Sequence, residues 1–254
     1  MKMLRTFAVA AILAVAGGAA LAQTQPVTPM PAMAMTDMSP VNDNGIFAHV
    51  MFDQLEGRFL GSGGGEFRWD GQGWIGGDYD KLWIKSEGFV RSNGTMDDGR
   101  QEFLYDHAIS TYWDLQAGLR ADIDSRPSRE WAAFGVQGLA PLFFDLEATA
   151  YVSDQGHFAG RVQASYDLLI TNRLILQPEA ELNLYSKADP GRLVGAGFSD
   201  LDTGLRLRYE FDRKFAPYIG VAYENKFGQA AGLARKAGES TGGVRVLVGL
   251  HTWF

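Results

Sequence analysis

Cysteine is absent from this chain of 254 residues, and only four histidines are present. The chain therefore forms no disulfide and has no thiolate zinc site, and a cysteine-free chain suits an oxidising compartment. Basic residues are in the minority, with 23 Lys and Arg against 30 Asp and Glu and a formal net charge of −7. This balance argues against a nucleic-acid partner. The sequence also lacks G-x-S-x-G and H-E-x-x-H, so we expect no enzymatic activity.

After the first 22 residues, the chain has no apolar run long enough for a membrane-spanning helix. Residues 1–22 combine Lys2 and Arg5, an apolar run at 7–15 and a small-residue ending. This pattern is typical of a secretory signal peptide, and the apolar run is shorter than the ~20 residues of a helical span. We predict a signal peptide over residues 1–22, with a membrane anchor as the alternative. Its removal takes the formal charge from −7 to −9.

What the chain does have is strict alternation of apolar and polar residues. Leu205 and Leu207 share one parity, and Arg206 and Arg208 share the other. A period of two places such sets on opposite faces of a β-strand. We predict about twelve strands, and their length of ~9–11 residues or more fits membrane strands better than soluble ones. The predicted strands are 51–60, 64–75, 80–90, 101–109, 113–123, 130–139, 143–153, 157–170, 173–185, 200–212, 215–227 and 243–254.

The links between these strands largely alternate in length. Short links such as "TN" and "RK" follow the eighth and tenth strands, whereas long, glycine-rich links follow the third, ninth and eleventh. Short periplasmic turns and longer outer loops are typical of outer-membrane barrels, and a soluble β-sandwich has no reason to show them. The fold class is therefore predicted to be all-β, an antiparallel transmembrane β-barrel over residues 46–254. The final Trp253-Phe254 also resembles the ending of bacterial outer-membrane proteins.

The polar parity of these strands is expected to face the lumen, with both signs of charge interspersed. Paired charges that only support the barrel are one interpretation, and a path or site for cations is the other. Aromatic residues near strand ends, among them Trp113, Tyr151, Tyr218 and Phe211, are expected to form interfacial girdles. The predicted lumen set is Glu56, Arg58, Arg68, Asp70, Lys85, Glu87, Asp114, Arg120, Asp122, Asp145, Glu147, Arg161, Asp167, Glu179, Glu181, Arg206, Arg208, Glu210, Glu224, Lys226 and Arg245.

Residues 23–45 lack periodicity and are predicted to form a disordered, Met-rich periplasmic tail. Its stretch "PMPAMAMTDMSP" carries four methionines without aliphatic or aromatic neighbours to pack against. Thioethers are soft ligands that suit Cu(I), so we predict copper capture here, with incidental methionines as the alternative. The four candidate ligands in the tail are Met30, Met33, Met35 and Met38.

Closing the barrel would pair the last strand with the first, which brings His49, Met51 and His251 to the same rim. Imidazole and thioether are both copper ligands, so these three residues are further metal candidates. Two unrelated rim histidines are the alternative interpretation.

Long segments of the chain resemble the copper resistance protein B family. They include "GWIGGDYDKLWIKSEG" (73–88), "WAAFGVQGLAP" (131–141), "TNRLILQPEAELNLY" (171–185), "SDLDTGLRLRYE" (199–210) and "FAPYIGVAYENKFG" (215–228). The resemblance covers nearly all of residues 46–254. It implies an outer-membrane β-barrel in a copper-resistance system, beside a periplasmic multicopper oxidase, with a variable Met- and His-rich N-terminal segment. This chain keeps the methionines but has little histidine there.

Together these observations predict a copper-resistance barrel in the outer membrane of a Gram-negative bacterium, surrounded by outer-membrane lipid. It is expected to bind copper through its Met-rich tail and to support copper homeostasis or passage across that membrane. Copper is expected as a ligand rather than a catalytic cofactor, mainly as Cu(I), with Cu(II) as a second candidate. The alternative is a general small-solute or structural barrel without a metal role.

Overall fold

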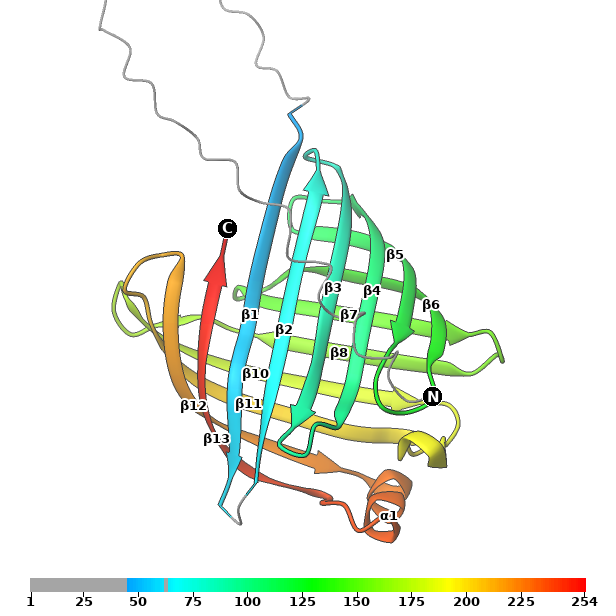
Figure 1. Ribbon diagram of the computed structural model, residues 1–254. Helices are drawn as coiled ribbons and strands as arrows, with labels where there is room; N and C mark the ends of the chain where they lie inside the picture. The colour runs from blue at the N-terminus through cyan, green and yellow to red at the C-terminus, as the bar shows by residue number, and fades with distance from the viewer. Residues whose placement is uncertain (1–44, 62–63) are drawn as a thin grey trace, which may run out of the picture. The chain divides into compact units, whose positions relative to one another are not determined.

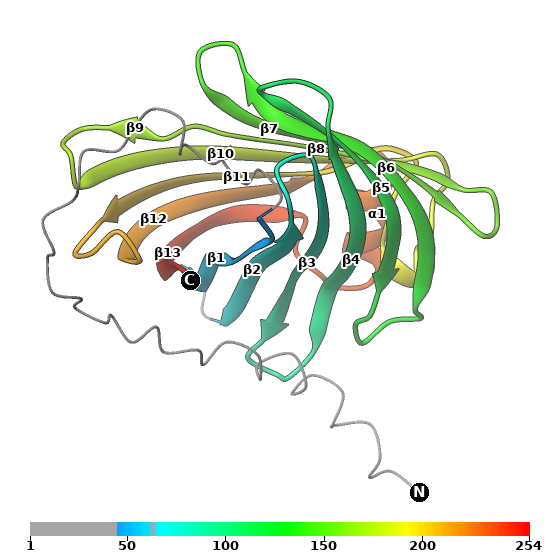
Figure 2. The same cartoon turned by 90° about the horizontal axis from the view of Figure 1, so that it is seen from above.

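The computed structural model describes residues 45–61 and 64–254, and these form one antiparallel β-barrel (Figures 1 and 2). The long strands pair with their neighbours in chain order around the ring, and β8 and the short β9 both pair with β10. The strands are β1 (Phe47–Leu60), β2 (Gly65–Gly76), β3 (Asp80–Arg91), β4 (Met96–Ala108), β5 (Trp113–Asp122), β6 (Arg129–Ala140), β7 (Phe144–Ser153), β8 (Phe158–Ser165), β9 (Leu168–Leu169), β10 (Leu174–Tyr185), β11 (Gly197–Tyr209), β12 (Phe215–Lys226) and β13 (Gly242–Trp253).

The barrel closes where β1 pairs with β13. The backbones of Val50 and Phe254 exchange hydrogen bonds of 3.2 and 2.8 Å beside this seam. The two strands lie side by side in Figure 1. On the other side of the ring, β10 pairs with β11, so the sheet has no free edge among the twelve long strands. The predicted antiparallel barrel of about twelve strands is confirmed.

One predicted strand, 157–170, is interrupted in the structure. β8 ends at Ser165 and the two-residue β9 resumes at Leu168, with both pieces pairing to β10. The interruption lies opposite Pro178 of β10, which has no N–H to donate to the ladder. The carbonyl of Pro178 still accepts a 3.1 Å hydrogen bond from the Tyr166 amide. Proline thus explains why a strand of the predicted length appears as two pieces.

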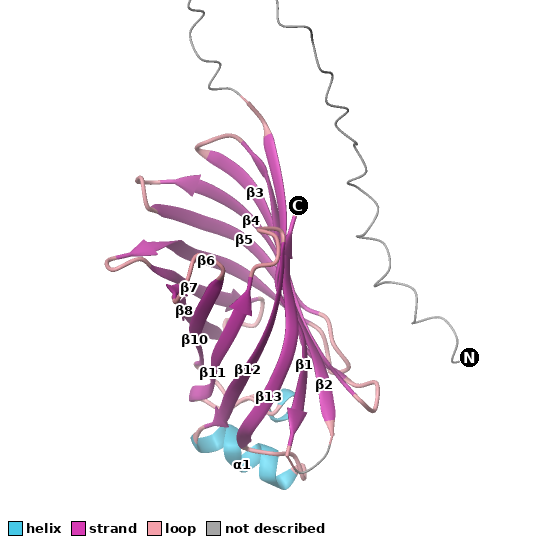
Figure 3. Ribbon diagram, turned by 90° about the vertical axis from the view of Figure 1, so that its left-hand side faces the viewer, coloured by secondary structure: helices cyan, strands magenta, loops and turns pink. Residues whose placement is uncertain are grey.

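The long link after β12 contains a helix that the alternation pattern does not predict. Helix α1 (Gly228–Lys236) buries Ala230, Ala231 and Ala234 and is drawn in cyan in Figure 3. Alanine is the strongest helix former, and Arg235 and Lys236 in the last turn complement the helix dipole. Among the described residues, no helix is both long and apolar enough to cross a bilayer.

The two ends of the barrel differ in their links. We call the end at which β1 begins and β13 finishes the short-link end, because it carries links 77–79, 109–112, 141–143 and 210–214. The other, long-link end carries α1, the short 3-10 helix Pro190–Arg192 and the links 186–196 and 227–241. The predicted long links after the ninth and eleventh strands are therefore confirmed at this end. The predicted long link after the third strand is wrong, because β4 already begins at Met96 and leaves only residues 92–95 between β3 and β4.

The two parities of each strand face opposite sides of the wall, as predicted. Leu205 is 42% exposed on the outside, whereas Arg206 is 2% exposed in the lumen. The outward-facing aromatic prediction holds for Phe211 at 65% exposed, but it is wrong for Tyr151 and Tyr218, which are 1% and 4% exposed. Both tyrosines point inward because their hydroxyls donate to lumen carboxylates, which satisfies a buried polar group.

Candidate functional site

Ion pairs fill the side of the lumen that is lined by β1, β11 and β12. Glu56 is fully buried and accepts hydrogen bonds from Arg58 at 2.7 Å, Arg206 at 3.0 Å and the Tyr218 hydroxyl at 2.9 Å. Arg58 also contacts Asp202 at 2.8 Å across the β1–β11 side. Buried charges must be paired, and Glu56, Arg58 and Arg206 line neither of the two cavities of the lumen.

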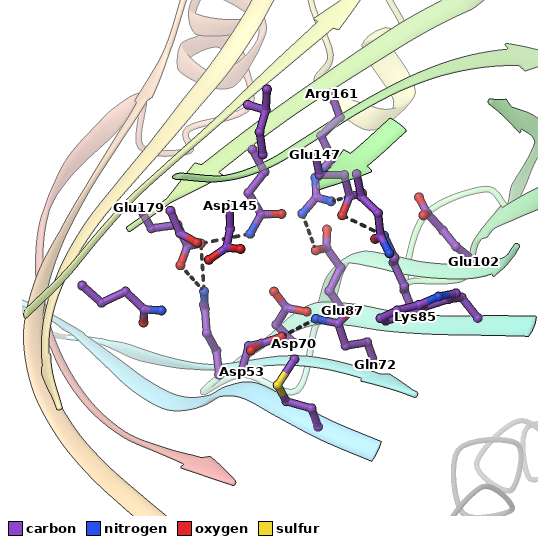
Figure 4. Close-up of a pocket in the computed structure, with 18 of the residues that line it drawn as sticks. Asp53, Asp70, Gln72, Lys85, Glu87, Glu102, Asp145, Glu147, Arg161 and Glu179 are labelled. Atoms are coloured by element: carbon purple, nitrogen blue, oxygen red, sulfur yellow. Dashed lines mark hydrogen bonds and ion pairs between the residues drawn. The ribbon is translucent and has the colours of Figure 1, made fainter. Parts of the chain in front are cut away.

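The rest of the lumen contains two cavities. The first, which we call the short-link cavity, has a volume of about 500 Å³ and is lined by residues toward the short-link end, with ten of them labelled in Figure 4. Nine of its lining side chains are Asp or Glu and four are Lys or Arg. The acidic residues are Asp53, Asp70, Glu87, Glu102, Asp114, Asp145, Glu147, Asp167 and Glu179. This cavity therefore favours cations.

The second, or long-link, cavity has a volume of about 450 Å³ and lies toward the long-link end. Ten of its lining side chains are acidic and nine are basic, so its charges nearly balance. Ion pairs connect the strands around this cavity to the links at the same end. Arg91 of β3 lies 3.1 Å from Glu239, and Arg129 of β6 lies 3.2 Å from Asp189. The excess of carboxylates is thus confined to the short-link side of the barrel.

A β-bulge in β1 shapes the wall of the short-link cavity. The register with β2 shifts between Phe52 and Gln54, so the consecutive residues Asp53 and Gln54 both line the cavity. Bulges re-aim side chains in this way at the rims of barrels. Asp53 accepts a 2.7 Å hydrogen bond from Gln72, and its carboxylate lies 3.8 Å from Nδ1 of His251.

The structure brings the three predicted rim candidates to the short-link end. Met51 and His251 both line the short-link cavity. His49 instead lies among indole rings, with its ring centroid 6.2 Å from that of Trp74 and 5.5 Å from that of Trp253. Within residues 45–61 and 64–254, no three His, Asp or Glu side chains are grouped so as to hold a metal ion. The four tail candidates, Met30, Met33, Met35 and Met38, lie outside the described residues.

Sequence reasoning did not assign the aromatic side chains of this rim to the lumen. Trp83 lines the short-link cavity, and its ring lies 6.3 Å from that of Trp74 on the neighbouring strand. The signal was available, because Trp83 shares its parity with the lumen residues Lys85 and Glu87. Parity alone therefore assigns Trp83 to the lumen.

Comparisons with known proteins place this barrel in a family. The sequence model described as "Copper resistance protein B precursor (CopB)" matches residues 46–254. A copper resistance protein B homolog of Pseudomonas syringae pv. tomato is 42% identical over 247 residues, covering 94% of this chain and 83% of that protein. Copper resistance protein B of Escherichia coli is 44% identical over 214 residues, covering 84% of this chain and 72% of that protein.

Among solved structures, the NanC porin superposes with a TM-score of 0.54 at 12% sequence identity, covering 81% of this chain and 99% of that one. At this identity the likeness concerns the fold alone, and it supports the assignment of an outer-membrane type of barrel. The family matches and this fold together support a location in the outer membrane.

Proposed function

The chain belongs to the copper resistance protein B family, and from that premise we propose that its Met-rich segment collects Cu(I) and that its short-link cavity accepts the ion for passage. The family supports a role in copper resistance. The observation that carries the finer proposal is the charge asymmetry of the lumen, with nine acidic against four basic side chains in the short-link cavity. The same cavity is lined by the candidate ligands Met51 and His251.

The chemistry of the Met-rich segment supports the first step. Four thioethers within nine residues offer soft, uncharged donors, and Cu(I) accepts such ligands without strict geometry. Met38 is eleven residues before His49 in the chain. A fully extended segment of that length reaches at most ~40 Å, so the distance along the chain is compatible with delivery to the rim.

The acidic cavity supports the second step. A concave site lined by one sign of charge raises the local concentration of the opposite ion. Carboxylates hold a cation less tightly than thioethers hold Cu(I), because Cu(I) is a soft ion and carboxylate is a hard ligand. An ion that leaves the Met-rich segment for this cavity would therefore remain mobile, as passage requires. Short links on the periplasmic side would orient the cavity toward the periplasm.

Cu(I) titration of the full-length protein in detergent, with a reductant and a competing colorimetric chelator, tests the first step. Replacing Met30, Met33, Met35 and Met38 together by leucine should abolish most of the Cu(I) binding. Met96→Leu is the matched control, because Met96 lies at the start of β4 at the long-link end and should change nothing.

The pH dependence of the same titration separates thioether from imidazole binding. Thioethers carry no proton, so we expect the affinity to vary little between about pH 5 and pH 7, whereas a histidine site would weaken as imidazole protonates near pH ~6.5. Equal Cu(I) binding by wild type and the four-leucine variant would contradict the role of the Met-rich segment. The Met51→Leu/His251→Gln variant would then show whether the rim binds the ion instead.

A further inference from the structure

The boundary between the two cavities is formed by very few residues. Among the residues that the structure describes, Glu87 and Arg100 are the two that line both cavities. They are direct neighbours in the β3–β4 ladder, and Nη1 of Arg100 lies 3.0 Å from the Glu87 carboxylate. The two cavities are thus adjacent compartments of one lumen with a side-chain partition between them.

Arg161 completes this partition from the opposite wall. It projects from β8, and its Nη2 donates a 2.8 Å hydrogen bond to Glu87 on β3, as the dashed line in Figure 4 shows. The same guanidinium lies 3.1 Å from Glu181 on β10, and Arg100 lies 3.7 Å from that carboxylate. We call Glu87, Arg100, Arg161 and Glu181 the septum. The lumen is therefore divided at the septum by ion pairs between side chains.

The septum has alternative partners within reach. Arg161 also lies 3.4 Å from Glu147, which lines only the short-link cavity, whereas Glu181 lines only the long-link cavity. Nε of Arg100 and Nε of Arg161 are buried and make no directed hydrogen bond. A guanidinium that is paired by charge but incompletely hydrogen-bonded is held less firmly than a fully satisfied one. The arginines can therefore exchange carboxylate partners on the two sides without leaving an ion unpaired.

From this geometry we propose that the septum is the gate of the barrel. At rest its ion pairs separate the two cavities, of about 500 and 450 Å³, and prevent ion flow. Exchange of carboxylate partners by Arg100 and Arg161 opens the partition. The gate itself is independent of the copper assignment, and only the identity of the cargo rests on the proposed function.

Single-channel recording in planar lipid bilayers tests the gate with potassium chloride alone. Wild type should conduct weakly. The variant Arg100→Ser/Arg161→Ser should conduct several-fold more and select cations, because it leaves the septum carboxylates in the opened lumen. The variant Glu87→Ser/Glu181→Ser should also conduct more, but with selectivity shifted toward anions. Opposite shifts of the reversal potential in a salt gradient are a signature that general loosening of the barrel would not produce.

The matched control is Arg120→Ser/Asp122→Ser. This pair is equally buried, with a 2.7 Å contact, but it lines only the long-link cavity. It should enlarge that cavity and leave the conductance at the wild-type level. If a double variant does not fold, the single change Arg161→Gln, which removes the charge but keeps an unbranched polar side chain, should still raise the conductance.

Three results would overturn the gate. The first is a wild-type conductance that is already as high as that of the septum variants. The second is a septum-variant conductance no higher than that of a weakly conducting wild type. The third is a conductance of Arg120→Ser/Asp122→Ser as high as that of the septum variants. Because potassium chloride carries the current, failure here leaves the copper proposal standing. Conversely, failure of Cu(I) binding leaves the gate standing.

Discussion

Leu205→Arg is the substitution that tests most sharply which face of the wall meets lipid. Leu205 is 42% exposed on the outside of β11, between Pro178 and Val221 in the ladder. β11 has 13 residues with its midpoint at Thr203. A strand rises ~3.3 Å per residue and tilts by ~40°, so Leu205 lies about 5 Å from the bilayer midplane along the normal.

At that depth an outward-facing arginine costs ~2–4 kcal/mol, and the cost falls to ~0–1 kcal/mol near the interface. Phe198 provides the matched control, because it faces outward on the same strand at 59% exposed. It lies five residues from the midpoint, or about 13 Å along the normal, at the edge of an apolar band ~25 Å tall. Leu205→Arg should therefore be less stable than Phe198→Arg by about 2 kcal/mol.

The assay is a guanidinium titration of protein folded into phospholipid vesicles, followed by tryptophan fluorescence. The midpoint should shift while the slope stays the same, since the surface exposed on unfolding does not change. Equal free energies of unfolding for Leu205→Arg and Phe198→Arg would contradict the depth assignment. A Leu205→Arg variant as stable as wild type would contradict the assignment of this face to lipid.

Three further outcomes follow from the same structure. Arg206→Leu should cost ~3–5 kcal/mol in that titration, because it leaves the buried Glu56 short of a partner, and adding Glu56→Gln should recover part of the loss. The folded barrel should migrate faster unheated than boiled on a denaturing gel, and identical mobility would contradict a closed barrel. Glu239 lies in link 227–241. Burial raises the pKa of its carboxyl, but the hydrogen bond and the charge of Arg91 lower that pKa by more, so the net pKa is below its ordinary value. The ion pair of Glu239 with Arg91 therefore stabilises the link at any pH above the ordinary pKa of a glutamate. This stabilisation is lost as the pH falls through the lowered pKa. A spin label at Ala237→Cys should become mobile only in acid, and with Glu239→Gln it should be mobile at every pH.

The architecture was predictable because a barrel wall has one simple period. Alternation at Leu205 and Arg206 determines which residues meet lipid and which meet the lumen, and closure follows from link lengths and strand number. The break after Ser165 was not predicted, because the alternation continues through it and the cause, Pro178, is on the neighbouring strand. Helix α1 was missed because its glycines and its place in a long link suggested irregular structure.

The sequence predicts which face most septum residues occupy, but not which of them pair. Parity assigned Glu87, Arg161 and Glu181 to the lumen, but which charges pair across it depends on strand stagger and on the levels at which side chains meet. Arg161 on β8 and Glu87 on β3 are joined only by closing the ring. The bulge that turns Asp53 and Gln54 into one cavity is likewise invisible to a strict period of two.

Copper survival is the measurement that tests the central claim most directly. A strain that lacks this gene would be complemented with wild type, with the variant carrying leucine at Met30, Met33, Met35 and Met38, or with an empty vector, and grown over increasing copper. We predict that wild type restores growth at copper concentrations that stop the empty-vector strain, and that the four-leucine variant restores it only in part. Equal survival of all three strains would contradict a role in copper resistance and favour a general small-solute or structural barrel.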